Sequence, residues 1–367
     1  MSWILAFVGF ALLVILHELG HFTAAKVVGM RVEKFSLFFP PTLLKKRVGE
    51  TEYAVGAIPA GGYVKITGMN PDEKLPDEVR TRAYYSQPVW KRIVVIAAGP
   101  AVNLILAFLL LLVFFWAIGA ETGTSRVGAI QKGYPAAAVL RPGDELVAVD
   151  GRRGSPQELS ALIARHKCPE RPPTKGCEAA TPATVTIERG GRERTFKLTP
   201  IYDPTAPTTD PDNPGRTRLG FSYAAGPRDP LPFGQALDLT ANRFWFITKA
   251  TIELPARLID PQQRKEISGV VGSYEVTRQT ILNDLAEVVG ILAIISLSLA
   301  IVNLFPFLPL DGGHIFWAIV EKIRRKPVPF SVMERAGVIG FMLVILIFLV
   351  GLSNDIDRLS GEGFQVR

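Results

Sequence analysis

The chain has 367 residues, of which 48% are hydrophobic, and carries a formal net charge of +7, so it is long enough for two or three folded units. The hydrophobic residues gather in a few long runs, and basic residues lie in short segments beside those runs. No aromatic and basic stripe accompanies them, which argues against nucleic-acid binding and favours a protein of the lipid bilayer. Two cysteines are too few for a disulfide scaffold.

The first apolar run, residues 1–29, contains the sequence LVILHELGHFTA. It has no basic leader and no small-residue cleavage site, so we expect a transmembrane helix rather than a signal peptide. His17 and His21 are four residues apart, which places both imidazoles on one helix face, where they can bind one metal ion. Glu18 is positioned as a general base beside that metal. Ordinary core histidines are the weaker interpretation, because unpaired polar groups are costly in hydrocarbon.

Residues 30–92 are predicted to form a cytoplasmic-side loop that contains a membrane-associated β-hairpin. The segment TEYAVGAIPAGGYVKITGM is strand-like, and its glycines, including Gly61 and Gly62, mark bends. Its apolar residues, including Tyr63, need a partner surface. We therefore favour a strand pair that dips toward the metal site and offers an edge to an extended substrate. A hairpin that only packs is the alternative.

Three further runs are predicted to be transmembrane helices, namely residues 93–118, 285–310 and 336–352, because each approaches the roughly 20 residues that span a bilayer. Basic residues after the first and third spans place residues 30–92 and 311–335 in the cytoplasm by the positive-inside rule. Both termini, including the tail 353–367, and residues 119–284 would then be extracytoplasmic. The predicted fold is a polytopic α-helical membrane protein with four transmembrane helices, a β-hairpin and a β-rich domain outside.

Residues 119–201 are predicted to be that β-rich domain. Its sequence GYPAAAVLRPGDELVAVDG combines a helix-like turn with an alternating strand, and a later pair of strands has two glycines at its tip. This pattern resembles a PDZ domain of the type found in bacterial envelope proteases. The resemblance implies that an extended peptide or a chain end binds along a sheet edge. Any other small β-domain is the alternative.

The two cysteines, Cys168 and Cys177, flank a proline-rich stretch of this domain. In an exported domain we favour a local disulfide between them. A metal site that uses the nearby His166 is the weaker interpretation, and two free thiols are the third.

Residues 202–284 are predicted to be a linker followed by an amphipathic helix. Residues 202–230 are rich in proline, aspartate and threonine, as linkers are. Residues 233–258 mix apolar and charged side chains and are too polar to span the bilayer, so we expect a helix at the outer interface. Packing against the soluble domain is the alternative.

A catalytic zinc site has three protein ligands and one open position, so a third ligand is needed beside the two histidines. The sequence NLFPFLPLDGGH supplies Asp311 after a stretch that Pro306 and Pro309 break. Unwound backbone is tolerated at membrane depth only where it is buried in protein or lines a cavity. Asp311 is therefore the predicted third ligand. An ordinary aspartate at a helix end is the alternative.

Together, H-E-L-G-H, GPAVNLILA and N-x-F-P-x-x-P-L-D-G-G, with one PDZ-like domain between the last two, resemble the site-2 protease family of intramembrane zinc metalloproteases. The closest pattern is its bacterial RseP-like branch, and the resemblance covers nearly the whole chain. It implies that His17, His21 and Asp311 bind Zn²⁺ and that Glu18 activates water.

The resemblance also implies a substrate-binding region around Asn303. Asn103 is assigned equally to substrate contact and to packing between helices. His314 is expected to support the site or to be simply structural. The full set of predicted substrate-binding residues is Asn303, Pro306, Pro309, Asn103, Gly61, Gly62 and Tyr63.

The function implied is a zinc-dependent endopeptidase of the bacterial inner (cytoplasmic) membrane that cuts single-span proteins within or near their transmembrane segment. Anti-sigma factors and signal-peptide remnants are the implied substrate classes, and the PDZ domain would admit trimmed substrates. Two alternatives are a membrane-anchored zinc protease that cuts soluble proteins and a non-proteolytic PDZ scaffold or transporter with a degenerate metal site. The intact Glu18, both histidines and Asp311 argue against degeneration.

Overall fold

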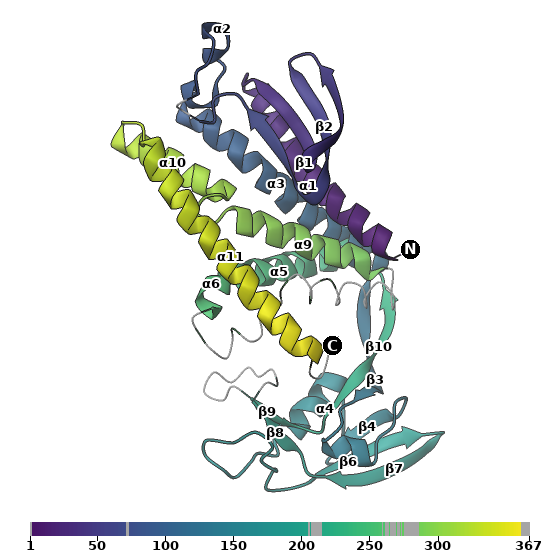
Figure 1. Cartoon of the computed structure of the whole chain (residues 1–367). Helices are drawn as coiled ribbons and strands as arrows, with labels where there is room; N and C mark the ends of the chain where they lie inside the picture. Colours follow the sequence, from purple (N-terminus) through teal and green to yellow (C-terminus); the bar gives the residue numbers. More distant parts are fainter. Residues whose placement is uncertain are drawn as a thin grey trace. The chain divides into compact units, whose positions relative to one another are not determined.

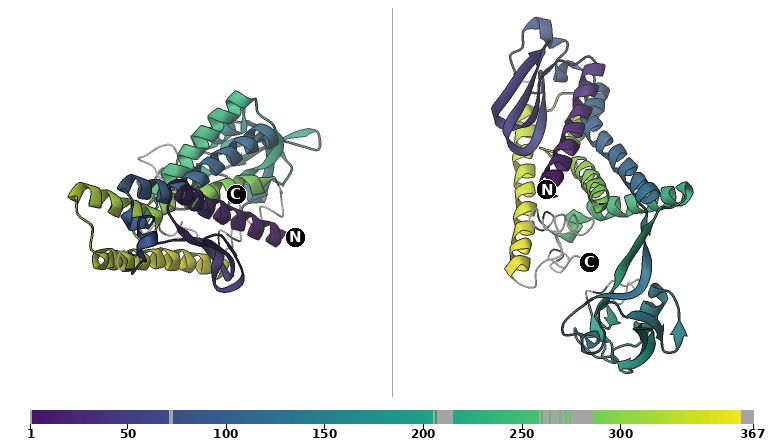
Figure 2. Two further views of the ribbon diagram at one scale, coloured as in Figure 1. Left: turned by 90° about the horizontal axis from the view of Figure 1, so that it is seen from above. Right: turned by 90° about the vertical axis from the view of Figure 1, so that its right-hand side faces the viewer.

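The computed structural model describes residues 2–70, 73–204, 206, 215–258, 260, 264, 269, 272, 274 and 286–360. The chain divides into two compact units. Unit 1 comprises Met1–Ile118 and Leu231–Val366, and unit 2 comprises Gly119–Pro230. Unit 1 consists of helices and one long β-hairpin, whereas unit 2 is rich in β-strands (Figures 1 and 2).

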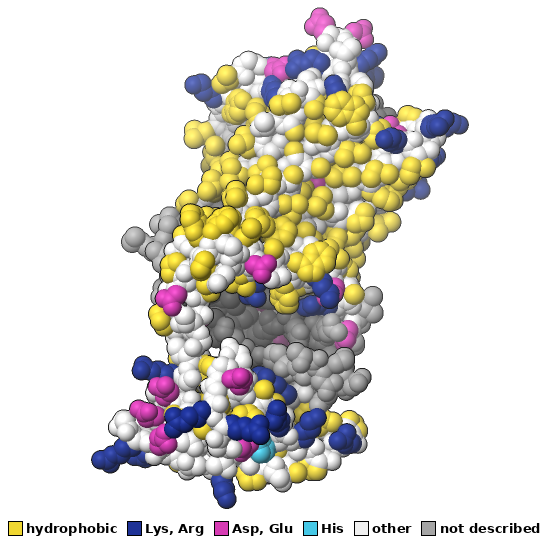
Figure 3. Space-filling view, turned by 180° about the vertical axis from the view of Figure 1, so that it is seen from behind, with side chains coloured by type: hydrophobic (Ala, Val, Ile, Leu, Met, Phe, Trp, Pro, Cys, Tyr) yellow, Lys and Arg dark blue, Asp and Glu magenta, His cyan; other side chains and the backbone are white. Residues whose placement is uncertain are grey.

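Three helices of the described chain are long and apolar enough to cross a membrane, over Phe7–Val27, Val89–Ile118 and Ser331–Asp357. Figure 3 shows a broad field of apolar side chains on the displayed face of unit 1, as expected for a lipid-facing surface. The helices of unit 1 are α1 (Ser2–Val27), α2 (Asp77–Arg80), α3 (Val89–Val113), α5 (Phe233–Ile252), α6 (Leu254–Arg257), α9 (Glu287–Asn303), α10 (Asp311–Arg324) and α11 (Phe330–Ser360).

The prediction of four transmembrane helices is therefore wrong for the residues that the structure describes. The predicted third span, residues 285–310, contains only α9, whose 17 residues are about 26 Å long and fall short of a hydrocarbon core of about 30 Å. The helix ends at Asn303 because the chain unwinds through the segment that holds Pro306 and Pro309. Helix α10 then begins at Asp311, where we expected a loop.

Helix α3 is central in unit 1, because α1, α9 and α10 all pack against it. Ala107 of α3 and Leu297 of α9 are fully buried in one cluster between these two helices. The amphipathic segment expected at 233–258 forms α5 and α6, and α5 packs on α3 and α9. For example, the rings of Phe108 and Phe244 are 5.8 Å apart.

The hairpin pairs β1 (Val32–Val48) with β2 (Thr51–Ile66) in antiparallel register. Both strands bend, so Leu37 of β1 faces Val55 on one side and Gly62 on the other. The last part of β2, Gly62–Ile66, is consequently an outer edge that no other described strand covers. Figures 1 and 2 show the hairpin beside α1, against which it packs.

Unit 2 is built on a six-stranded sheet with the order β10-β3-β4-β6-β7, in which β5 pairs with β4. Ser155 caps the one α-helix that is described in this unit with a complete capping box. A disulfide joins Cys168 to Cys177, whose Cα atoms are 5.8 Å apart. The elements are β3 (Ala120–Ile130), β4 (Glu145–Val149), β5 (Arg152–Arg153), α4 (Pro156–Ile163), β6 (Ala183–Arg189), β7 (Arg192–Leu198), β8 (Ile201–Asp203), β9 (Arg216–Arg218) and β10 (Phe221–Asp229).

Residues 216–229 form β9 and β10, although the sequence predicted a linker there. Their side chains explain the difference, because Leu219 is only 1% exposed and both Phe221 and Tyr223 pack against the buried core of the unit. The prolines and aspartates that precede this segment dominate its composition and obscure a short alternating pattern.

Asp144 forms a buried ion pair with Arg189 in unit 2. Its side chain is 2% exposed and accepts hydrogen bonds of 2.6 Å from both Nε and Nη2 of Arg189. These bonds hold the pKa of the Asp144 carboxyl below its ordinary value. The stabilisation is therefore fully present above the unfolded-state pKa of about 3.9 and is lost as the pH falls through the lowered folded-state pKa.

We expect Asp144→Asn to lower the free energy of unfolding of unit 2 by about 2 to 4 kcal/mol at neutral pH, since it leaves Arg189 without a counter-charge. Hydrogen exchange of residues 119–230 in the full-length protein would measure the loss. The control is Glu193→Gln, which breaks the exposed pair with Arg153 and should cost less than about 1 kcal/mol. Equal losses in the two variants would contradict the assignment.

Candidate metal centre

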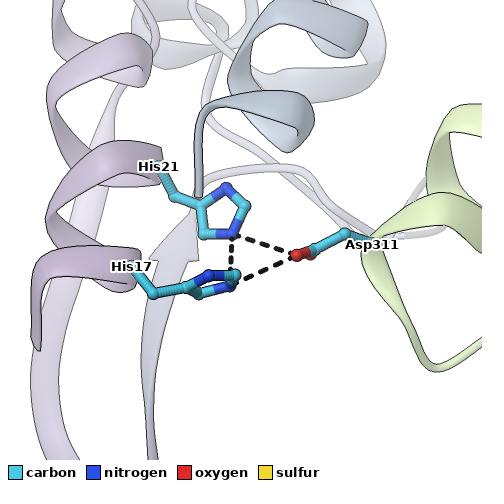
Figure 4. A group of neighbouring side chains, drawn as sticks. All are labelled: His17, His21 and Asp311. Carbon is cyan, nitrogen blue, oxygen red and sulfur yellow. Dashed lines mark hydrogen bonds and ion pairs between the residues drawn. The ribbon is translucent and has the colours of Figure 1, made fainter. Parts of the chain in front are cut away.

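Three ligand-type side chains meet between α1 and the first residue of α10 (Figure 4). The Nε2 atoms of His17 and His21 are 3.2 Å apart, and each is 3.3 Å from Oδ2 of Asp311. Ligand atoms at about 2.0–2.1 Å around a tetrahedral Zn²⁺ are separated by about 3.3 Å. The triangle therefore fits one zinc ion and leaves the fourth coordination position free.

The polarity of this cluster also fits a cation. Both histidines are less than 9% exposed, and Oδ2 of Asp311 is buried with no hydrogen-bond donor among the described residues. A buried carboxylate oxygen without a donor costs several kcal/mol, and a metal ion removes that cost. The cluster is therefore more stable with a bound cation than with the three side chains alone.

Asp311 reaches the histidines because the chain folds tightly before α10. A Cβ atom on Gly312 would lie 2.2 Å from the carbonyl oxygen of Leu304, so only glycine permits this close approach. The Asp-Gly-Gly sequence thus holds the carboxylate at the start of the helix, over the unwound segment that follows α9.

Helix α3 supplies partners to the Nδ1 atoms of both imidazoles, on the side away from Asp311. Nδ1 of His21 donates a hydrogen bond of 2.8 Å to the carbonyl oxygen of Val95. Nδ1 of His17 lies 3.3 Å from the side-chain amide of Asn103, which is fully buried. When Nδ1 carries the proton, Nε2 presents its lone pair to a metal, and such outer partners typically fix the tautomer of a histidine ligand.

The amide of Asn103 is assigned with Oδ1 as the acceptor from Nδ1 of His17. With the opposite orientation, Nδ2 would donate to Nδ1, and Oδ1 would be buried without a donor among the described residues. Because exchanging the two atoms moves Nδ2 into that buried place, the assignment is made from the metal site: Nε2 of His17 can bind a cation only when Nδ1 carries the proton and donates it to Oδ1. Asn103 thus lies behind a ligand rather than on the cavity wall.

Sequence reasoning missed the way in which α3 supports the site. A Cβ atom on Gly99 would lie 2.2 Å from Nε2 of His21, so α3 can approach this ring only at a glycine. Val95, Gly99 and Asn103 recur every four residues and so share one helix face. A glycine and an asparagine on one face of an otherwise apolar span were the available signal.

A cavity of about 610 Å³ opens beside the cluster. Of the predicted substrate-binding residues, Asn303, Pro309, Gly61, Gly62 and Tyr63 line it, together with His314, whereas Pro306 and Asn103 do not. The wall thus combines the outer edge of β2 with the end of α9 and the unwound segment. Apolar side chains complete it, including Phe10, Val14, Phe39, Ile96 and Leu299.

Glu18 faces this cavity from α1, next to the ligand His17. The backbone of β2 passes directly beside it, since a Cβ atom on Gly62 would lie 2.9 Å from Cγ of Glu18. A carboxylate, the edge of β2 and the ligand triangle therefore adjoin one another. This is the arrangement that metal-assisted hydrolysis of an amide requires.

Comparison with known proteins identifies the family. A model of peptidase family M50 matches residues 5–347, which include the ligand triangle and Glu18. Proteins named "Putative zinc metalloprotease" from Nostoc sp. and Brucella suis biovar 1 are each 29% identical, over 96% and 94% of this chain and 93% and 92% of their own lengths. One from Campylobacter jejuni is 28% identical over 95% of this chain and 92% of its own length. The chain belongs to peptidase family M50, the family of the site-2 proteases.

Proposed function

We propose that this chain is a zinc-dependent endopeptidase that hydrolyses peptide bonds within or near the transmembrane segment of single-span membrane proteins. The triangle of His17, His21 and Asp311 carries the proposal, because two of its members lie inside the candidate span Phe7–Val27. Its dimensions suit zinc, and membership of family M50 supports peptidase chemistry. A scissile bond at the same depth would explain why the site is built there.

The residues around the triangle suggest how the reaction proceeds. Bound Zn²⁺ supplies Lewis acidity, which activates water and polarises a peptide carbonyl. Glu18 would accept the proton from that water and pass it to the leaving amine. The hydrogen bonds from His17 and His21 to α3 would hold both rings in place during the reaction.

The substrate would bind in an extended form, since a helix hides its carbonyl groups in its own hydrogen bonds. No described strand other than β1 pairs with the edge Gly62–Ile66, which lies beside Glu18 and could accept such a segment as an added strand. Asn303 and Pro309 also line the cavity, and its apolar lining residues suit the side chains of a transmembrane segment.

The finer features of the RseP-like branch belong to the same proposal. Unit 2, with a sheet and one capped helix, would act as a PDZ domain that binds a peptide or chain end. Anti-sigma factors and signal-peptide remnants are the substrate classes that this resemblance favours. The basic residues of the hairpin region favour a cytoplasmic position for it, and hence the bacterial inner membrane with unit 2 outside.

We expect Glu18→Gln to reduce kcat for a single-span reporter in proteoliposomes by at least about 1,000-fold while zinc stays bound, because the amide keeps the shape but cannot accept a proton. Asp311→Ala should instead lower the zinc content, measured by metal analysis. Normal turnover by Glu18→Gln would refute the proposed role of the carboxylate. A normal zinc content in Asp311→Ala would show that the third ligand is elsewhere.

Asn103→Ala should weaken zinc binding by about 10- to 100-fold, measured by competition with a chelator, since it removes the partner of Nδ1 of His17. Ser296→Ala is the matched control. Its hydroxyl donates to the backbone carbonyl oxygen of Asn103 at 2.9 Å, and no hydrogen bond joins it to His17 among the described residues. Equal zinc affinities of the two variants would contradict the positioning role of the amide.

A further inference from the structure

The hairpin has a second hollow, separate from the cavity that Glu18 faces. Its volume is about 400 Å³, and we propose that it binds an acyl chain of an anionic phospholipid. Lys46, on the same face of the strand as Leu44, would hold the lipid phosphate, and Lys45 and Arg47 beside it would add positive charge. The lining residues are Ile15, Phe35, Leu37, Leu44, Lys45, Lys46, Tyr53, Ala54 and Val55.

The wall of this hollow is one face of the sheet together with Ile15 of α1. Leu37 and Leu44 both pair with Val55, and residues paired across antiparallel strands point to the same face. Leu44 is 70% exposed. An apolar side chain this exposed on the wall of an apolar hollow indicates that hydrocarbon covers it in the membrane.

The hollow lies at the depth of the bilayer. The ring of Phe35 is 5.4 Å from Phe22 and that of Phe38 is 5.9 Å from Phe7, so the first half of β1 runs beside nearly the whole candidate span of α1. Lys26, in the last turn of that span, pairs with Glu50 at 2.6 Å, which places the Gly49-Glu50 turn at the membrane surface.

Along the strand the basic residues lie nearer the membrane surface and the apolar residues lie deeper, as the headgroup and acyl chain of a lipid do. Lys45, Lys46 and Arg47 precede Glu50 by three to five residues, which is at most about 17 Å along the strand. Leu44 and the residues that it faces lie farther from the surface. A phosphate at Lys46, which shares the face of Leu44, would therefore point its acyl chain toward the apolar wall.

The three basic side chains are available to bind an anion. All three basic side chains are exposed, and none forms an ion pair within the part of the chain that the structure describes. The neighbouring carboxylates are already engaged, since Glu52 pairs with Lys34 at 3.2 Å and Glu50 with Lys26. A phosphodiester would supply the counter-charge, and basic residues at a membrane surface attract anionic lipids.

Native mass spectrometry of the purified full-length protein, with dioleoyl phosphatidylglycerol or dioleoyl phosphatidylcholine added, tests the proposal. We expect the anionic lipid to be retained at least about tenfold better, and the triple variant Lys45→Gln/Lys46→Gln/Arg47→Gln to lose about tenfold or more of that binding. The matched control, Lys322→Gln/Arg324→Gln/Lys326→Gln, removes as many exposed charges from the end of α10 and should bind normally. Zinc content reports that each variant is folded.

Two further arms test the acyl chain. Leu44→Gln should weaken binding of the dioleoyl lipid by about threefold or more, and a dihexanoyl phosphatidylglycerol should bind more weakly to the native protein. Equal retention of the two dioleoyl lipids, or an equal loss in the control triple variant, would overturn the proposal. So would full competition by glycerol phosphate, because a headgroup alone would then account for binding.

Discussion

The structure of unit 1 depends on one constraint, which is that two imidazoles and one carboxylate are held about 3.3 Å apart where all three side chains are largely buried. Such groups destabilise a membrane helix unless a metal or a dense set of partners compensates them. Both kinds of compensation are present. The triangle has the dimensions of a zinc site, and α3 supplies a carbonyl group and an amide to the far side of the rings.

This constraint explains features that would otherwise be faults in a membrane protein. Gly99 removes a side chain from the middle of α3 so that the ring of His21 can approach. The unwound segment after α9 shortens that helix, but it brings Asp311 to the site and contributes Pro309 to the cavity wall. Irregular backbone is tolerated at this depth because it lines a cavity rather than facing lipid. The strands of the hairpin similarly bend, and the bend leaves a strand edge beside Glu18.

Sequence patterns predicted the parts of the site that depend on local spacing. His17 and His21 meet because a helix repeats every 3.6 residues, and the two prolines before Asp311 indicated an unwound segment. The count of four spans was wrong because hydropathy continues through residues 304–310 although the helix does not. The sequence narrowed the role of Asn103 only to substrate contact or packing between helices, because the choice depends on how α1 and α3 pack. The strands at 216–229 were masked by the composition of their neighbours.

The central claim is that zinc is bound by two imidazoles and one carboxylate from α1 and α10. X-ray absorption spectroscopy at the zinc edge, on the purified full-length Glu18→Gln protein, tests it most directly. One zinc per chain should show two imidazole ligands and light oxygen ligands at about 2.0–2.1 Å. Asp311→Ala should remove the carboxylate contribution from any zinc that remains. Sulfur ligands, or an unchanged spectrum in Asp311→Ala, would contradict the proposed centre.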